Sequence, residues 1–319
     1  MAKIESLPSG VKITNDADAG LGFVESTLTH VEAKVYEKEY RHIVYADIVP
    51  VSNEAGEGAT SITYYSIDGA TMGKFIGSNA IDVPMSEIST KQHIVPVELG
   101  AVGYQYSDEE LRQSAMIGKP LPQLKANLTM RGFEEHAQRV CFNGDKDKNL
   151  EGFLNNKNVP SSTVASPSTA GGTEWSKKTP DQILADINNL FAQVWETTQE
   201  VEKPDSLLLP TSQFSHIANT PRSYNSDTTI LQYIVKNSIY INSAEDIKSL
   251  PELKGAGVGS TDRMMVYTKD IDKVVFHIPM PFRIEQPVRE ALGWKIPGVY
   301  KLSGVEFRYP LSASYADGI

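Results

Sequence analysis

Apolar residues spaced three and four apart mark one long helix in the first half of the chain. Its start is indicated at Ser107-Asp-Glu-Glu110, where a serine precedes a glutamate by three residues, as in a helix-capping box. Apolar positions keep helical spacing as far as Asn143-Gly144, with an interruption at Gly118-Lys-Pro120. We therefore expect a long helix from Ser107 to Gly144, broken near Gly118.

A second amphipathic helix is predicted to begin at Thr179-Pro-Asp-Gln182. This stretch combines a capping threonine, a proline at the first helical position and a capping-box glutamine. Its apolar face follows at spacings of three and four: Ile183, Leu184, Ile187, Leu190, Phe191, Val194 and Trp195. Shorter helices are predicted over 211–219 and 227–237, and the loop-like region 157–178 separates this lobe from the first helix.

Runs of β-branched and aromatic residues predict strands on both sides of these helices. They cover 41–50, 61–67, 93–97, 101–106, 205–210, 239–241, 263–268 and 273–278, and alternation continues through 282–311. The chain therefore mixes α and β, which we assign to the α+β class. We find no internal repeat.

The stretch from about residue 51 to 92 has too little core-forming material for a compact domain. Glycines recur in it at 56, 58, 69, 73 and 77, around one strand-like run. Long loops in compact proteins are usually functional or disordered. We interpret the stretch as an extended β-loop that lies on a neighbouring copy, and its candidate contact residues are Tyr64, Tyr65, Met72, Lys74 and Phe75.

The first 39 residues are polar and mixed, with few apolar positions before Val31, Val35 and Tyr36. Such a segment predicts an extended arm followed by a short ordered stretch, and the arm needs a partner surface. No apolar core of a signal peptide is present in residues 1–20, and no later run is long enough for a membrane span. We expect a protein that is made and used in a cytoplasm.

Composition and net charge exclude two classes of protein, a largely disordered chain and one that binds nucleic acid stably. The chain has 319 residues, of which 40% are hydrophobic and 22% charged, typical of a folded protein. Its net charge of -10 has the wrong sign for stable binding to nucleic acid. The same acidity would keep any contact with DNA weak and without sequence specificity.

The residues that could carry chemistry form no recognisable site. Gly255-Ala-Gly-Val-Gly259 lacks the glycine spacing of a dinucleotide loop and predicts a surface loop. Asp145-Lys-Asp-Lys-Asn149 resembles the start of a calcium loop, but Leu150 stands where the glycine belongs, so a turn is expected. Cys141, the single cysteine, and six scattered histidines give no metal set or catalytic pair. We expect no catalytic residue, no metal and no cofactor.

Several short sequences together resemble one protein family. They are Tyr104-Gln-Tyr-Ser-Asp-Glu-Glu-Leu111, Gly118-Lys-Pro-Leu121, Arg139-Val-Cys-Phe-Asn-Gly144, Leu150-Glu-Gly-Phe-Leu-Asn155, Pro204-Asp-Ser-Leu-Leu-Leu-Pro210 and Phe214-Ser-His-Ile-Ala218. These stretches, in this order, are similar to the long-helix region and the following lobe of major capsid proteins from tailed bacteriophages. The resemblance covers roughly residues 44–310 and implies the Hong Kong 97-like fold.

The resemblance implies five segments. Residues 1–44 would be the N-terminal arm and lead-in, and 45–106 peripheral-domain strands with the extended loop. The spine helix and its following turn would occupy 107–156, the axial domain 157–278, and a return to the peripheral domain 279–319.

The implied function is structural. Copies would assemble through pentamers and hexamers into an icosahedral shell, a virion capsid around phage double-stranded DNA, built in the cytoplasm of the bacterial host. The short segment ahead of the first strands predicts a separate scaffolding protein, and a portal and a decoration protein are further expected partners. No membrane partner is expected.

Two alternatives stay open at this point. One is an encapsulin-type shell, a bacterial nanocompartment of the same fold around a cargo enzyme, which neighbouring genes would distinguish from a phage. The other is an α/β enzyme based on the middle lobe, for which no nucleophile, metal set or cofactor loop is found.

Overall fold

The computed structural model describes residues 42–70, 74–75, 85, 87–117, 121–166, 172–223 and 227–319. Contacts along the chain divide it into Met1–His42 and Ile43–Ile319, and only His42 of the first unit is described.

The long predicted helix is present in two parts. Helix α3 spans Asp108–Ile117 and α4 spans Leu121–Asn143, while residues 118–120 lie outside the described residues. Ser107 and Glu110 bond to each other's backbone N–H groups, at 3.1 Å in both directions, and so form the expected capping box. Helix α4 ends where Gly144 takes a φ of +67°, a conformation that glycine adopts without strain.

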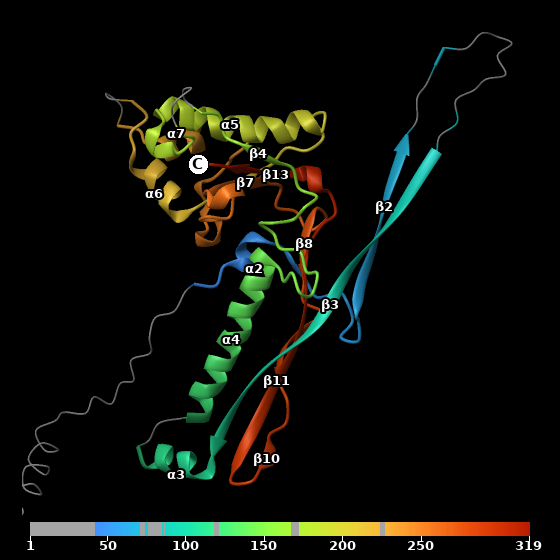
Figure 1. Ribbon diagram of the computed structural model, residues 1–319, viewed down its shortest axis with the longest axis vertical. Coiled ribbons are helices and arrows are strands. Elements are labelled where there is room, and N and C mark those ends of the chain that lie inside the picture. The colour runs from blue at the N-terminus through green and yellow to red at the C-terminus, as the bar shows by residue number, and fades with distance from the viewer. Residues whose placement is uncertain are drawn as a thin grey trace, which may run out of the picture. The chain divides into compact units, whose positions relative to one another are not determined.

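Helix α4 lies along a five-stranded sheet (Figure 1). The strands of this sheet are β2 (Ser61–Ala70), β3 (Glu87–Ser107), β9 (Met280–Ile284), β10 (Val288–Glu290) and β11 (Gly293–Ser303). The two predicted strands at 93–97 and 101–106 are one continuous β3, because β11 pairs with it without a break from Val97 to Ser107.

A small second sheet pairs a strand from near the start of the described chain with two strands from its last fifty residues. It contains β1 (Val51–Ser52), β8 (Val274–His277) and β12 (Val305–Phe307), in the order β1-β8-β12. Its side chains Phe276, Val305 and Phe307 pack into the same hydrophobic cluster as Phe142 and Phe153 at the end of α4. This cluster thus buries the C-terminal half of α4.

The third sheet forms the lobe that follows the loop-like region. Its order is β4 (Ser161–Thr163), β13 (Ala313–Asp317), β7 (Arg263–Tyr267), β5 (Ser206–Leu209) and β6 (Ile247–Ser249). The helices of the lobe are α5 (Pro180–Thr197), α6 (Thr211–Asn219) and α7 (Ile230–Asn237). Short 3-10 turns cover Trp175–Lys177, Ala244–Asp246, Pro251–Leu253, Val258–Ser260 and Pro310–Ser312.

The predicted cap of α5 is confirmed. Thr179 and Gln182 make the capping box of α5, with Pro180 at its first position. Helix α6 has the predicted bounds, and α7 begins at Ile230, later than predicted, because Thr229 rather than Asp227 caps it. The apolar face of α5 is buried in a second hydrophobic cluster with Leu207 and Val266.

The strand predicted over 41–50 is wrong. Arg41 lies outside the described residues, and Tyr45–Ile48 form one helical turn, α2. The carbonyl of Asp47 accepts hydrogen bonds from Lys248 and Lys269, and that of Ile48 accepts one from Tyr267. Donors from distant parts of the chain satisfy the end of this turn, which the local preference for a strand does not anticipate.

The strand predicted over 239–241 is also wrong. Tyr240 and Ile241 are buried, but their side chains pack against the second cluster from an irregular segment, with Tyr240 stacked on Phe191. The neighbouring position beside β5 is taken by β6, whose Ile247 pairs with Leu207.

The last strand departs from the expected grouping of residues 279–319. β9 to β12 lie in the first two sheets, but β13 pairs with β7 and β4 in the lobe that was assigned to 157–278. Its side chains Ala313, Tyr315 and Ala316 are buried there, and Asp317 pairs with Arg263 of β7. Apolar burial and this ion pair together account for where the strand lies.

Candidate functional site

The outer part of β2 and β3 forms a two-stranded ribbon, residues 61–70 and 87–96 (Figure 1). The two faces of this ribbon differ in polarity. Residues paired directly across antiparallel strands carry their side chains on the same face. The register pairs Tyr65 with Gln92, Ile67 with Thr90 and Gly69 with Ile88. Tyr65, Ile67, Ile88 and Ile94 therefore share one face, and they are 64%, 71%, 73% and 62% exposed.

This apolar face continues a face that is covered elsewhere in the same sheet. Farther along β3, Val102 lies against α4 at Gly132, and the Tyr300 ring covers Gly100 while it packs on Phe133. In the ribbon the structure describes no segment over the corresponding side chains. A contiguous exposed apolar surface of this kind marks an interaction site, whereas single exposed apolar residues are ordinary.

The opposite face of the ribbon turns toward the rest of the molecule. The Tyr64 ring stacks on His93 with centroids 4.7 Å apart, and Ser66 Oγ lies 3.0 Å from His93 Nε2. The Tyr64 hydroxyl donates to the carbonyl of Phe307 at 3.4 Å, and burial raises the pKa of Tyr64. This face therefore attaches the ribbon to β12.

A few polar contacts hold the base of the ribbon. Arg283 pairs with Glu57 at 3.0 Å, Lys301 donates to the carbonyl of Ala59 at 3.1 Å, and Lys148 pairs with Glu98 at 3.4 Å. Exposed ion pairs contribute little to stability because water and salt screen them. The ribbon is held at its base and left apolar on its outer face.

The residues predicted for the extended loop are only partly brought together. Tyr65 lies on the apolar face, Lys74 and Phe75 are exposed near the end of the loop, and Phe75 has no cover at 108% exposure. Tyr64 lies on the other face, against the body of the molecule. Met72 lies outside the described residues.

Sequence reasoning missed three members of the apolar face: Ile67, Ile88 and Ile94. The signal that could have found them is period-two alternation combined with the pairing of the two strands. Alternation in one strand alone does not reveal which residues of the other strand lie beside it.

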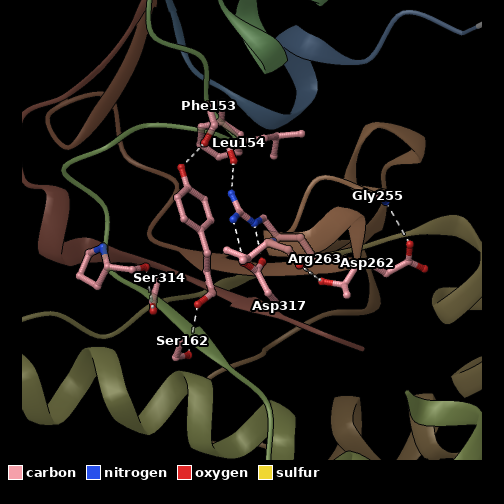
Figure 2. Close-up of polar contacts among 12 residues, drawn as sticks. Phe153, Leu154, Ser162, Gly255, Asp262, Arg263, Ser314 and Asp317 are labelled. Carbon is pink, nitrogen blue, oxygen red and sulfur yellow. Dashed lines mark hydrogen bonds and ion pairs between the residues drawn. The ribbon is translucent and has the colours of Figure 1, made fainter. Parts of the chain in front are cut away.

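A buried ion pair fixes the lobe of the third sheet to the end of the long helix (Figure 2). The Arg263 guanidinium binds both carboxylate oxygens of Asp317, at 2.6 and 2.9 Å, and donates to the carbonyl of Leu154 at 2.6 Å. The Tyr315 ring lies 4.6 Å from the guanidinium, and the Tyr315 hydroxyl donates to the carbonyl of Phe153 at 2.6 Å. These contacts join β7 and β13 to the turn after α4.

Two carboxylates, those of Asp317 and of Asp262, bond to the backbone of the glycine-rich loop that was predicted as a surface loop. Asp262 accepts from the N–H of Gly255 at 3.1 Å, and Asp317 accepts from the N–H of Val258 at 3.0 Å. An anion-binding loop needs its backbone N–H groups free to face the anion. Two of these groups are already bonded to carboxylates, so the loop is not suited to hold phosphate.

The side chains that could take part in chemistry are far apart, buried or already hydrogen-bonded to other groups. Cys141 is fully buried, and burial raises the pKa of its thiol, which keeps the reactive thiolate scarce. His136 Nδ1 lies 2.5 Å from the Tyr300 hydroxyl, and the predicted turn at 145–149 closes through backbone bonds between Asp145 and Leu150. The described residues contain no metal-holding group of His, Cys, Asp and Glu, and none of their helices could span a membrane.

Comparison with known families and structures agrees with these observations. A sequence model of the family described as Major capsid protein matches residues 72–319. No curated protein matches the chain. The matched residues include α4, the β3 strand of the ribbon and the whole lobe of the third sheet.

Solved structures share the fold at low sequence identity. The capsid of Myoviridae phage XM1 matches with a TM-score of 0.79 and 16% identity, over 98% of this chain and 100% of that one. A Mycobacterium phage Ogopogo structure gives 0.61 and 12%, over 92% and 98%. A virus-like particle from Pyrococcus furiosus gives a weaker likeness, 0.51 and 11%, over 85% and 91%.

The family match spans most of the chain, and the same order of loop, long helix and mixed lobe underlies the similarity to phage capsids. The alternative of a shell around cargo has only the weaker likeness in its favour. The chain belongs to the major capsid protein family, has the Hong Kong 97-like fold and serves as a structural subunit of a phage capsid shell.

Proposed function

We propose that copies of this chain join through heterologous contacts into rings of five and six, which tile an icosahedral shell around phage double-stranded DNA. The observation that carries the proposal is the apolar face of the ribbon, where Tyr65, Ile67, Ile88 and Ile94 are exposed together. A neighbouring copy that covers this face would remove those side chains from water. Full burial of such a side chain contributes about 1.5–3 kcal/mol.

Each contact in the shell can then be modest. A subunit that rests its ribbon on one neighbour and receives the ribbon of another dissociates only when several contacts are lost together. Phe75 and Lys74, near the end of the loop, would extend the contact beyond the ribbon, as would Met72. Tyr64 would act indirectly, because it holds the ribbon at the angle from which Tyr65 meets the neighbour.

The remaining partners follow from the shell function. The net charge of -10 gives the subunit little affinity for phosphate, so packaged DNA would be contacted weakly and without sequence specificity. We expect assembly in the host cytoplasm with a separate scaffolding protein, and a portal and a decoration protein in the virion. Expression of this chain alone should give shells of irregular size, and uniform full-size shells without another phage protein would exclude the need for a scaffold.

The segment assignment completes the proposal. Residues 1–44 would serve as the arm, 45–106 and 279–312 as the peripheral domain, 107–156 as the spine helix with its turn, and 157–278 with β13 as the axial domain. Catalysis has no part in this function, since assembly needs only complementary surfaces.

The proposal is tested by placing charge on the apolar face. The double variant Ile67→Asp, Ile88→Asp should remain folded, because both side chains are exposed in the single subunit. Shells should disappear from negative-stain electron micrographs, because a neighbour would have to bury two unpaired carboxylates.

The control is Val201→Asp, which introduces one aspartate at a side chain of the lobe that is 77% exposed. This variant should assemble like the wild type. Normal shells from the double variant, with circular dichroism unchanged, would refute the role of the apolar face.

A further inference from the structure

The outer edge of β2 carries backbone groups that pair with no other strand among the described residues. The N–H of Val97 donates to the carbonyl of Thr60 at 3.0 Å, one register position beyond the Ser61–Pro96 pair. Thr60 and Val97 are therefore a hydrogen-bonded pair, and such pairs alternate with non-bonded ones along an antiparallel ladder. Ile62 and Tyr64 thus point their backbone groups toward β3.

The intervening residues point the other way. Thr63, Tyr65 and Ile67 direct their N–H and C=O groups away from β3, toward the outer edge. In the part of the chain that the structure describes, β2 pairs with β3 alone. Strand β11 pairs with β3 only from Val97 onward, so the ribbon itself has two strands. Two-stranded ribbons are marginally stable in water and gain from a third strand.

The edge of β2 also lacks the features that protect edge strands from pairing. Proteins usually protect such edges with lysine, proline or a bulge. The ten residues of β2 contain no lysine, arginine or proline, their single charged residue is Asp68, whose backbone groups face β3, and their register with β3 is regular. The other edge of the ribbon does have one of them, since Pro96 of β3 lies at a position whose backbone groups face away from β2. The two edges of the ribbon therefore differ in how well they are protected against pairing with another strand.

We propose that an extended segment of a second copy of this chain pairs with the outer edge of β2 and adds a third strand to the ribbon. The inference rests on the proposed shell function, in which copies lie side by side. The occupant is a second copy because the edge is continuous with the apolar face: Tyr65 and Ile67 supply both exposed side chains and outward backbone groups. Apolar burial is non-directional, whereas strand pairing sets the direction and register of the neighbour.

A proline at an outward position tests the edge without breaking the ribbon. Thr63→Pro removes one outward N–H and leaves the bonds between β2 and β3 in place, which proline permits on an edge strand. We expect the subunit to fold normally and the concentration needed for assembly to rise at least about tenfold, as loss of a backbone bond and the bulk of the ring combine.

Two controls make the result specific. Thr63→Ala removes the same side chain but keeps the N–H, and it should assemble like the wild type. Ile62→Pro removes an N–H that bonds to β3 instead. It should therefore disrupt the ribbon and show how loss of the ribbon itself affects assembly. Normal assembly of Thr63→Pro would overturn the inference.

Hydrogen exchange in the unmodified protein gives an independent readout. In the dissociated subunit the outward amides of Thr63, Tyr65 and Ile67 should exchange faster than the inward amides of Ile62 and Tyr64. In shells the outward amides should slow at least about tenfold, because a third strand would bond them. Equal exchange of the outward amides in subunit and shell would contradict strand addition.

The two proposals fail in different ways. If Thr63→Pro assembles normally while the charged double variant does not, the ribbon face is used and its edge is not. If both assemble normally, the proposed function of the ribbon fails with the inference.

Discussion

The lobe of the third sheet and the ribbon of β2 and β3 are built from the same kinds of residue with opposite outcomes. Leu208, on β5, is fully buried between a strand on each side and helices of its own chain. Ile67, on β2, has one neighbouring strand and is 71% exposed. The lobe completes its burial within one chain, whereas the ribbon leaves apolar surface that none of the described residues covers.

Their charged residues differ in the same sense. Arg263 is buried and makes three hydrogen bonds that join two strands to the turn after α4. Arg283, at the base of the ribbon, is exposed and pairs with Glu57 and Glu285. The Arg263 contact is buried and holds the interior of the lobe together. The Arg283 contacts are exposed and screened by water, so they hold the ribbon only weakly.

The largest effect is expected from Arg263→Ala. The substitution leaves the Asp317 carboxylate buried without its partner, so we expect the free energy of unfolding to fall by about 3–5 kcal/mol. Denaturant unfolding followed by circular dichroism measures this change. The control Arg283→Ala should leave the unfolding midpoint unchanged, and an equal loss in both variants would remove the contrast between lobe and ribbon.

The same truncation in the two regions sharpens the comparison. Leu208→Ala removes a fully buried side chain and should lower the free energy of unfolding by about 2–5 kcal/mol. Ile67→Ala should change it by less than about 0.5 kcal/mol in the dissociated subunit, because the side chain is already in water. A large loss of subunit stability in Ile67→Ala would mean that the ribbon packs on its own body.

A smaller effect concerns acid. Burial works to raise the pKa of Glu306, but hydrogen bonds from His277 and Arg308 outweigh it and hold that pKa below its usual range. A carboxyl whose pKa is lower when folded contributes stability above its unfolded value, and this is lost as the pH falls through the folded value.

Stability should therefore decline below about pH 4.5, the ordinary range of a glutamate. In Glu306→Gln the decline should be smaller and the stability at neutral pH lower. Thermal unfolding between about pH 3 and pH 7 measures both. An unchanged acid dependence in the variant would show that Glu306 does not contribute to it.

Much of the fold could be predicted because its signals are local. The capping boxes at Ser107 and Thr179 identify the starts of α3 and α5, and Gly144 marks the end of α4. These positions are determined by bonds within a few residues, so the sequence alone contains them.

The failures have the opposite cause. The turn at Tyr45–Ile48 is capped by side chains some two hundred positions away, and the segment 239–241 is displaced from β5 by β6. The apolar face was missed for the same reason, since it exists only through the register of β2 with β3. Tyr64 and Tyr65 are adjacent in sequence, yet the ribbon directs one to the body and the other to its outer face.

The central claim is that the apolar face of the ribbon is covered by a neighbour in the shell, and thiol labelling tests it directly. Cys141, the single cysteine of the chain, is buried with a raised thiol pKa, so an introduced cysteine reports on its own position. Ile67→Cys should react with a maleimide rapidly in the dissociated subunit and at least about tenfold more slowly in shells. Val201→Cys should react at the same rate in both states, and equally rapid labelling of residue 67 in intact shells would contradict the account.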